Sequence, residues 1–247
     1  MTGASGSSGS EPRILDSDGH RLDAVVTRPA GLVRGSIAVA HPHPAHGGNM
    51  DHSVVVAIVA RAVASGLVAL RFDVRGVRHS DGDPEDAVGH LVDLFVASDA
   101  AAAEAPVGLP RYGGGFSYGA RLWLEAVRAP SAPPVVGLVL AAPATRVPRT
   151  PRDFGDLLLG RPIRDAALDP RVLERLARVP VAARILVGEH DGVAPSHEVT
   201  RHAGPSATVE VLPGLNHFFS RSSGAGSTDL PALHAALDRA FASLPRS

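Results

Sequence analysis

Short apolar runs alternate with longer amphipathic stretches along most of the chain. The short runs have the composition of buried strands, at residues 36–40, 67–72, 135–141, 183–187 and 208–212. The longer stretches have the length and apolar spacing of helices, at residues 52–65, 86–104 and 229–243, with one more expected to begin near residue 196. Repeated strand–helix units predict an α/β fold, with a mostly parallel central sheet and helices on both faces.

The start of the chain departs from this pattern. Residues 1–10 are rich in Gly and Ser and no apolar segment follows them, so residues 1–11 are predicted to be a disordered leader and not a signal peptide. Residues 13–28 alternate in polarity around the Ser17-Asp18-Gly19 turn, which predicts two antiparallel strands. Because no linker-like break follows, residues 12–247 are predicted to form one domain.

Composition narrows the classes of partner. The formal net charge is −1, which gives no basic surface for nucleic acid or for an anionic membrane. The longest apolar runs are far too short to cross a bilayer. We therefore expect a soluble, cytoplasmic protein that acts on a small molecule, while its oligomeric state is left open.

Lys and Cys are both missing from the sequence. Without lysine the chain has no Schiff-base nucleophile and no P-loop, and without cysteine it has no thiol nucleophile, disulfide or thiolate metal site. No Gly-x-Gly-x-x-Gly pattern is linked to a predicted strand either, so no cofactor and no metal are predicted. A covalent attack would have to come from a hydroxyl or a carboxylate.

The strongest candidate for such an attack is the Gly-x-Ser-x-Gly pattern at residues 115–119. It stands between a predicted strand and an apolar helical pattern, so it predicts a tight strand-to-helix turn. The flanking glycines let strand and helix approach closely, which lifts the hydroxyl of Ser117 out of the surface. Ser117 is therefore the predicted nucleophile.

Two further residues complete a catalytic set with this serine. A serine needs an imidazole to accept its proton, and the imidazole needs a carboxylate to orient it. Asp191, in a Gly-x-x-Asp segment after one predicted strand, and His217, after the next strand, supply both in that order. Glu189 and His190 are close enough to exchange roles with Asp191, but the Gly-x-x-Asp register favours Asp191. All of these residues follow strands, at the sheet edge where such folds bind ligands.

Five segments together resemble one known superfamily. They are the HPHP and Gly-Gly loop, the RFDxRG-like turn, the GFSxGA turn, the GxxD segment and the GxNHFF-like segment, at residues 41–48, 71–76, 115–120, 188–191 and 214–219. In these segments the chain is similar to α/β-hydrolases, and more narrowly to small bacterial serine hydrolases. The resemblance implies the α/β-hydrolase fold and cleavage of a small ester, thioester or amide through an acyl-enzyme on Ser117, without specifying the substrate.

A hydrolase of this type needs two N–H donors for the oxyanion. One should be the backbone N–H of Tyr118, the residue after the nucleophile, and the other should come from the loop after the strand that ends at residue 40. Pro42 and Pro44 have no N–H. Within the HPHP segment beyond the first histidine, only His43 can donate from its backbone, so we assign the second donor to His43.

Two alternatives use the same residues differently. The spacing of His41, His43 and His46 resembles the HxHxDH motif of metallo-β-lactamase-type hydrolases, although Ala45 stands in place of the aspartate. A metal-dependent hydrolase is therefore one alternative. In the competing interpretation, the side chains of His41 and His46 form hydrogen bonds with the loop backbone. The second alternative is a non-catalytic relative that binds a ligand without converting it.

Local expectations concern the loop after residue 72 and the strand before the nucleophile. Asp73 and Arg75 are expected to pair with each other and to hold the loop. Two departures from the resembling family stand out: relatives often have a small residue where this chain has Arg78, and Gly113 and Gly114 occupy strand positions where β-branched residues are usual.

The arginine-rich segment at about residues 144–180 is predicted to form a small lid. It lies between two predicted strands and is long enough for one or two helices. Its apolar patch at residues 154–159 would face the pocket, and its arginines (146–178) would lie at the mouth or on a solvated face. Such a lid favours acyl groups of short to medium length.

Overall fold

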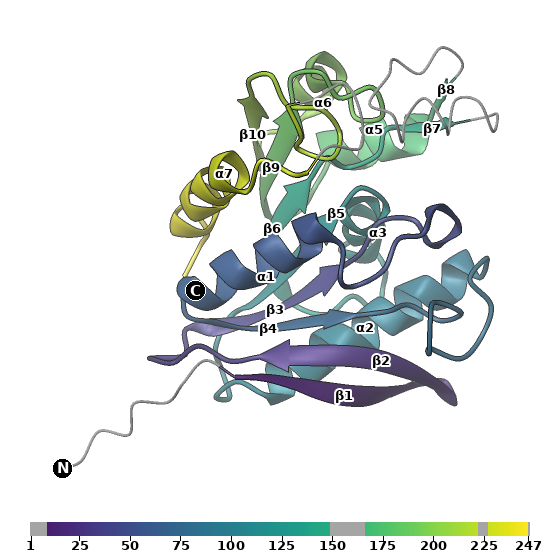
Figure 1. The fold of residues 1–247 in the computed structure, drawn as a ribbon, viewed down its shortest axis with the longest axis vertical. Coiled ribbons are helices and arrows are strands. Elements are labelled where there is room, and N and C mark those ends of the chain that lie inside the picture. Colours follow the sequence, from purple (N-terminus) through teal and green to yellow (C-terminus); the bar gives the residue numbers. More distant parts are fainter. Residues whose placement is uncertain (1–8, 149–165, 222–226, 247) are drawn as a thin grey trace.

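The computed structural model describes residues 9–148, 166–221 and 227–246, and its centre is an eight-stranded sheet (Figure 1). The strand order is β1-β2-β4-β3-β5-β6-β9-β10. β1 pairs antiparallel with β2, β2 pairs antiparallel with β4, and every later pair is parallel. The strands are β1 (Ser10–Ser17), β2 (His20–Thr27), β3 (Gly35–Ala40), β4 (Leu67–Phe72), β5 (Arg111–Phe116), β6 (Val135–Ala141), β9 (Ala182–Gly188) and β10 (Ala207–Leu212). The mostly parallel sheet expected from the sequence is confirmed.

Helices cover both faces of this sheet (Figure 1). Their bounds are α1 (Ser53–Ala64), α2 (Ala87–Ala103), α3 (Tyr118–Ala126), α5 (Pro170–Ala177), α6 (Ser196–His202) and α7 (Leu230–Ala242). Neighbouring residues of β5 show the two layers, because a side chain added at Gly113 would meet Trp123 of α3, whereas one added at Gly114 would approach Ile58 of α1. Helix α7 packs beside α1, and α2 packs beside α3.

Helix ends follow local signals in the sequence. Asp86 caps α2, because its side chain accepts a hydrogen bond from the N–H of Gly89. Asp229 caps α7 through the N–H of Ala232 in the same way. Gly66, with φ of +87°, follows α1 in the left-handed region that glycine adopts without strain.

The predicted leader is too long at its inner end. Residues 1–8 lie outside the described residues, but Ser10 and Glu11 already belong to β1, where they pair with Thr27 and Val26. Backbone pairing extends the antiparallel hairpin beyond the apolar alternation, and Glu11 adds ion pairs with Arg13 and Arg28. The ordered chain therefore starts before residue 12.

The predicted lid is described only at its edges, because residues 149–165, including the apolar patch, lie outside the described residues. Before and after this gap, β7 (Arg146–Pro148) pairs antiparallel with β8 (Ala166–Leu168). Helix α5 then packs against α3 and α6, with Val172 and Leu176 fully buried. Because α5 packs against α3 and α6, residues 170–177 belong to the helices of the main domain and not to the lid that we predicted up to residue 180.

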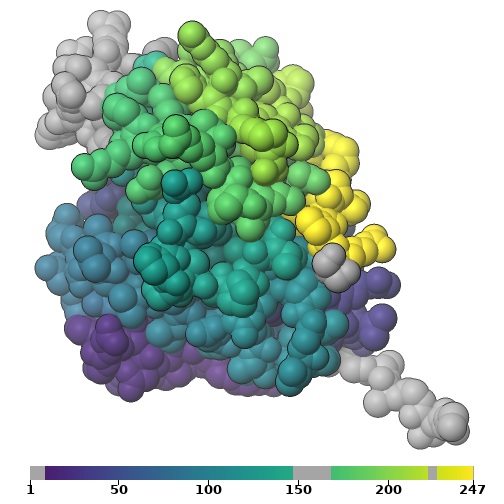
Figure 2. Space-filling view, turned by 180° about the vertical axis from the view of Figure 1, so that it is seen from behind, coloured from purple at the N-terminus to yellow at the C-terminus, as the bar shows by residue number. Residues whose placement is uncertain are grey.

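Among the described residues, no helix is long and apolar enough to span a bilayer. The space-filling view from behind shows the N-terminal hairpin along one end of the molecule and the C-terminal third along the other (Figure 2). The core between them is built around large buried side chains, namely Trp123, Phe72, Phe116 and Phe219.

Candidate active site

The turn from β5 into α3 places Ser117 at the carboxyl edge of the sheet. Ser117 has φ of 53° and ψ of −110°, a strained conformation that its N–H supports by donating to the carbonyl of Ala141 at 2.9 Å. Both flanking glycines are required by space: a Cβ at Gly115 would lie 2.5 Å from the backbone of Gly119, and one at Gly119 would lie 2.2 Å from the Ala40 carbonyl oxygen. The Gly-x-Ser-x-Gly spacing thus has a direct steric cause.

Ser117, His217 and Asp191 form one hydrogen-bonded chain. The Nε2 atom of His217 lies 3.0 Å from the Oγ atom of Ser117. On the other side of the ring, Nδ1 lies 2.8 Å from Oδ2 of Asp191. Since an ionised carboxylate can only accept, Nδ1 carries the proton and Nε2 presents its lone pair to the serine hydroxyl. All three side chains are buried.

Asp191 is held by the backbone after β9. Its Oδ1 atom accepts hydrogen bonds from the N–H groups of Val193 and Ala194, each at 2.8 Å. Its neighbours are engaged elsewhere: Glu189 accepts from the N–H of Gly214, and the His190 side chain is exposed. The register that favoured Asp191 over Glu189 and His190 therefore agrees with the geometry.

The loop after β10 carries His217 and is organised by Asn216, which the sequence analysis overlooked. The Oδ1 atom of Asn216 accepts hydrogen bonds from the N–H groups of Phe218, at 2.9 Å, and Ser220, at 3.0 Å. Phe219 takes a left-handed φ of 54° in the same turn and is fully buried. Asn216 next to the histidine was the available signal, because Asn side chains often bind their own backbone two residues on.

The loop after β3 folds over the serine. The carbonyl of His43 accepts from the N–H groups of His46 and Gly48, each at 3.1 Å. A side chain at Gly48 would lie 2.1 Å from the carbonyl oxygen of Pro42, which explains the glycine. The ring of His43 packs against the ring of Tyr118 with 4.7 Å between centroids. This contact brings the two residues assigned to the oxyanion site next to each other.

In the loop after β4, the ion pairs of Asp73 and Arg75 differ from those expected from the sequence. Arg75 does not pair with Asp73; its guanidinium binds Asp93 at 2.8 Å and Asp86 at 2.9 Å, both contributed by the chain around α2. Asp73 instead accepts from the N–H of Met50 at 2.7 Å, and its other oxygen lies 3.2 Å from Nε of Arg78. The prediction was wrong because tertiary packing places a buried carboxylate on α2 beside the guanidinium.

A small pocket of about 70 Å³ opens beside the serine. Its lining combines the β3 loop, the start of α1 and the segments around Ser117 and His217: Pro42, His43, His46, Gly47, Gly48, His52, Phe116, Ser117, His217 and Phe218. His52 was predicted only as a helix start. It caps α1, because its Nδ1 accepts from the N–H of Val54 at 3.3 Å, and its ring packs on Phe116 with 4.9 Å between centroids.

Burial keeps the surrounding imidazoles neutral. It lowers the pKa of His52 to about 4, with a further contribution from the nearby His217. Burial also lowers the pKa of His41 and that of His46 to about 4 and shifts the pKa of His43 downward. At neutral pH the pocket wall therefore offers polar N–H groups and lone pairs without net positive charge from these rings.

Two of the three histidines of the possible metal motif direct ring nitrogens to other partners. His41 is buried, with Nδ1 2.6 Å from the Pro42 carbonyl and Nε2 accepting from the N–H of Val74 at 3.2 Å. Nδ1 of His43 accepts from the N–H of Ala45 at 3.2 Å. Lone pairs that accept these hydrogen bonds cannot bind a metal ion at the same time. Within the described part of the chain, no group of three His, Asp or Glu is placed to hold a metal.

Comparisons with known proteins agree with this architecture. No protein-family model matches the chain. A protein of Rickettsia prowazekii described as uncharacterized is 26% identical over 189 residues, which is 73% of this chain and 70% of that protein.

Among solved structures, an α/β serine hydrolase of Xanthomonas campestris, described as having no lid, is similar with a TM-score of 0.71 and 23% identity, covering 96% of this chain and 95% of that one. An α/β serine hydrolase homologue of Coxiella burnetii has a TM-score of 0.69 and 24% identity over 93% of this chain and 96% of its own. A proline iminopeptidase of Mycobacterium smegmatis has a TM-score of 0.61 and 19% identity over 85% and 92%, respectively. The chain thus has the α/β-hydrolase fold.

Proposed function

We propose that this protein is a serine hydrolase that cleaves a small ester, thioester or amide through an acyl-enzyme on Ser117. The observation that carries the proposal is the continuous hydrogen-bonded chain from Ser117 through His217 to Asp191. Such a chain makes a serine hydroxyl nucleophilic, and it lies at the sheet edge where this fold binds ligands.

In the first half of the reaction, Nε2 of His217 takes the proton of the Ser117 hydroxyl as Oγ attacks the carbonyl carbon. Asp191 accepts the Nδ1–H hydrogen bond throughout and stabilises the imidazolium that forms. The imidazolium then gives its proton to the leaving group as the bond to the carbonyl carbon breaks. In the second half, a water gives its proton to Nε2 and attacks the acyl-enzyme, so that the acid is released and Ser117 regains its proton.

The oxyanion of each tetrahedral intermediate is assigned to the backbone N–H groups of Tyr118 and His43. The N–H of Tyr118 is in the first turn of α3, where N–H groups have no partner within the helix. The loop around His43 is held rigidly by its own backbone hydrogen bonds and by the Met50–Asp73 bond. Rigid donors of this kind need no reorganisation when negative charge develops.

The substrate is expected to carry a short to medium acyl group. A pocket of about 70 Å³ holds only a few heavy atoms, and its apolar floor of Phe116 and Phe218 suits a hydrocarbon or small aromatic part. We keep the proposal that residues before α5 form a small cover at the mouth. The similar Xanthomonas campestris structure is described as having no lid, so a cover is not a requirement of this fold.

Hydrolysis of p-nitrophenyl acetate and butyrate tests the proposal. The Ser117→Ala variant should lose activity by about a thousandfold or more. Labelling by a fluorophosphonate should occur in the wild type and should disappear in the same variant. Full activity in Ser117→Ala would refute the nucleophile, whereas labelling without turnover of any acyl substrate would favour a binding protein.

A further inference from the structure

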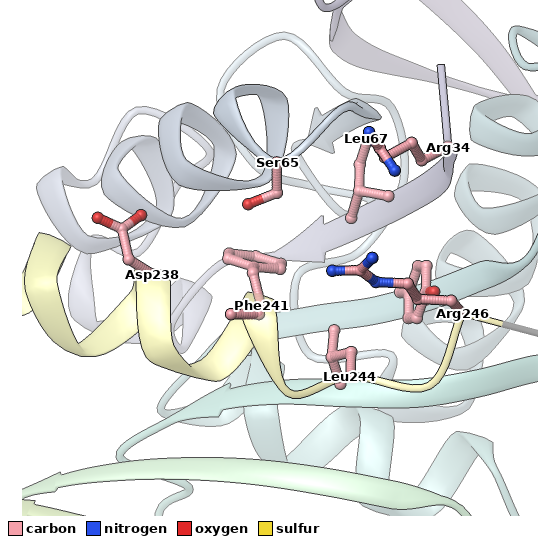
Figure 3. A pocket seen from close by; sticks show the side chains of 9 residues that line it. Arg34, Ser65, Leu67, Asp238, Phe241, Leu244 and Arg246 are labelled. Carbon is pink, nitrogen blue, oxygen red and sulfur yellow. The ribbon is translucent and has the colours of Figure 1, made fainter. Parts of the chain in front are cut away.

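A second, larger hollow lies at the opposite edge of the sheet from Ser117. It has a volume of about 380 Å³ and is formed where β4 and β5 begin, beside the end of α7 (Figure 3). Tyr112 is at the start of β5, and Ser117 directly follows its end. Five strand residues correspond to roughly 16 Å, so this hollow is separate from the catalytic pocket.

The walls of the hollow combine apolar side chains with polar groups. Leu67, Tyr112, Phe241 and Leu244 line it, and each of these side chains is otherwise buried. The hydroxyl of Tyr112 donates to the carbonyl of Pro245 at 2.5 Å, so the polar end of this side chain is already satisfied. The apolar side chains can therefore pack against a hydrocarbon or aromatic body, while the polar groups of the lining are available to a charged end.

The rim of the hollow is cationic. Arg34 and Arg246 both line it, and the side chain of Arg246 extends between Leu67 and Leu244 (Figure 3). Within the described residues, neither guanidinium has a carboxylate in ion-pair range. The carboxylate of Asp238 also lines the hollow, but Arg61 binds it at 2.6 Å.

Arg34 and Arg246 belong to the minority of the described arginines that have no carboxylate partner. Most arginines of the described chain pair with a carboxylate, for example Arg13, Arg28, Arg75, Arg121, Arg175 and Arg239. Two arginines that line the same hollow without such a partner leave a local excess of positive charge. A guanidinium fork matches a planar carboxylate through two parallel hydrogen bonds.

We propose that this second hollow binds a small monocarboxylate whose body is a single aromatic ring or a short aliphatic chain. The carboxylate lies between Arg34 and Arg246, and the body lies against Tyr112, Phe241 and Leu244. The volume is within the range of small-ligand sites. This site is independent of the proposed catalytic function, because it uses no residue of the catalytic pocket.

Titration of the ¹⁵N-labelled full chain with 4-phenylbutyrate tests the proposal. The amide chemical shifts of Gly66, Tyr112 and Arg246 are expected to change. These residues are well separated from Tyr118 and Phe218, which lie at the proposed catalytic pocket. The Arg34→Ala/Arg246→Ala double variant should bind about tenfold more weakly or worse. A control of equal charge, Arg178→Ala/Arg239→Ala, removes two exposed arginines outside the hollow and should bind like the wild type.

Two further probes on the wild type keep the test independent of the variants. The neutral 4-phenylbutan-1-ol should bind at least about tenfold more weakly than 4-phenylbutyrate, because it cannot satisfy the guanidinium groups. Inorganic phosphate should give no saturable shifts at Gly66 or Tyr112. The proposal is overturned by shifts confined to the catalytic pocket, by equal affinity for the alcohol, by binding of phosphate as tight as that of the acid, or by full affinity in the Arg34→Ala/Arg246→Ala variant.

Discussion

The carboxylate of Asp73 accepts a hydrogen bond from the backbone N–H of Met50, with 2.7 Å between the two atoms. Met50 follows the loop that carries His43, so this bond ties the end of β4 to the proposed oxyanion loop. Arg78 adds a second tie, because it binds Asp51 at 2.6 Å and approaches Asp73 at 3.2 Å. The arginine that departs from the resembling family therefore has a structural role, at a left-handed φ of 54°.

Asp73 should make stability depend on pH. Burial raises its pKa from 3.8 to about 6, against the opposing effects of the Met50 N–H and of Arg78. The pKa of Asp73 is higher in the folded protein than in the unfolded chain, so the folded state binds the proton more tightly. The stability that this proton contributes is fully present below about pH 4 and is lost as pH rises through 6. Urea denaturation should show that the free energy of unfolding of the wild type falls by about 2–3 kcal/mol relative to that of Asp73→Asn between pH 4 and pH 7.5. A difference that does not change with pH would contradict this.

Asn216 should position His217, the proposed general base, without touching the substrate. Asn216→Ala removes the acceptor for two N–H groups of the loop that carries His217. We expect kcat on p-nitrophenyl butyrate to fall by about ten- to hundredfold with little change in KM, because misplacement of the imidazole affects the chemical step. Asn216→Asp, which retains an oxygen acceptor, should keep more activity than the alanine variant. Equal activity of wild type and Asn216→Ala would show that the loop is held by other contacts.

Gly113 should be required for the packing of α3 on the sheet, whereas Gly31 should tolerate a side chain. A Cβ at Gly113 would lie 2.5 Å from the ring of Trp123, but at Gly31 it would meet nothing within 4 Å. Gly113→Ala is therefore expected to lower the free energy of unfolding by about 1–3 kcal/mol. Gly31→Ala, the matched control, should change it by less than about 0.5 kcal/mol or stabilise slightly. Denaturant melts of both variants provide the comparison, and equal stability of the two would contradict the steric explanation.

His52 should limit the size of the acyl pocket while capping α1. In His52→Asn the shorter side chain can still cap the helix, so stability should stay within about 0.5 kcal/mol of wild type, whereas His52→Ala should lose about 1 kcal/mol. Loss of the ring enlarges the pocket. The ratio of kcat/KM for p-nitrophenyl hexanoate to that for the acetate should rise by up to about tenfold in His52→Asn. An unchanged ratio would place the acyl group elsewhere.

The pKa of His52 also gives a check on this assignment. With a value of about 4, its imidazole is neutral throughout the range from about pH 5.5 to 9. The shape of the pH–rate profile in that range should therefore be the same in wild type and His52→Asn. A limb of the profile that disappears in the variant would show that His52 titrates during the reaction.

Features that depend on local spacing could be predicted from the amino-acid sequence. The run from Leu67 to Phe72 is a strand with the expected bounds, because a buried parallel strand leaves a short, continuous apolar signal. The turn around Ser117 could be recognised because its glycines stand at a fixed spacing around the serine, and Gly115 is required by the backbone of Gly119 only four residues away. The order of Ser117, Asp191 and His217 could be predicted for a related reason, since each lies in the turn or loop that follows a strand.

Contacts between side chains that are distant along the chain became visible only in the folded molecule. Arg75 pairs with Asp93 instead of Asp73, and His52 lines the pocket beside Ser117. Neither contact follows from a repeating pattern in the sequence. Gly113 is explained by Trp123, which lies on a different element. Periodicity reports that a position is buried, but the identity of its neighbour depends on strand order and on which helix covers which face. Strand order and helix placement are determined by packing of the whole core, so a local sequence pattern does not predict them.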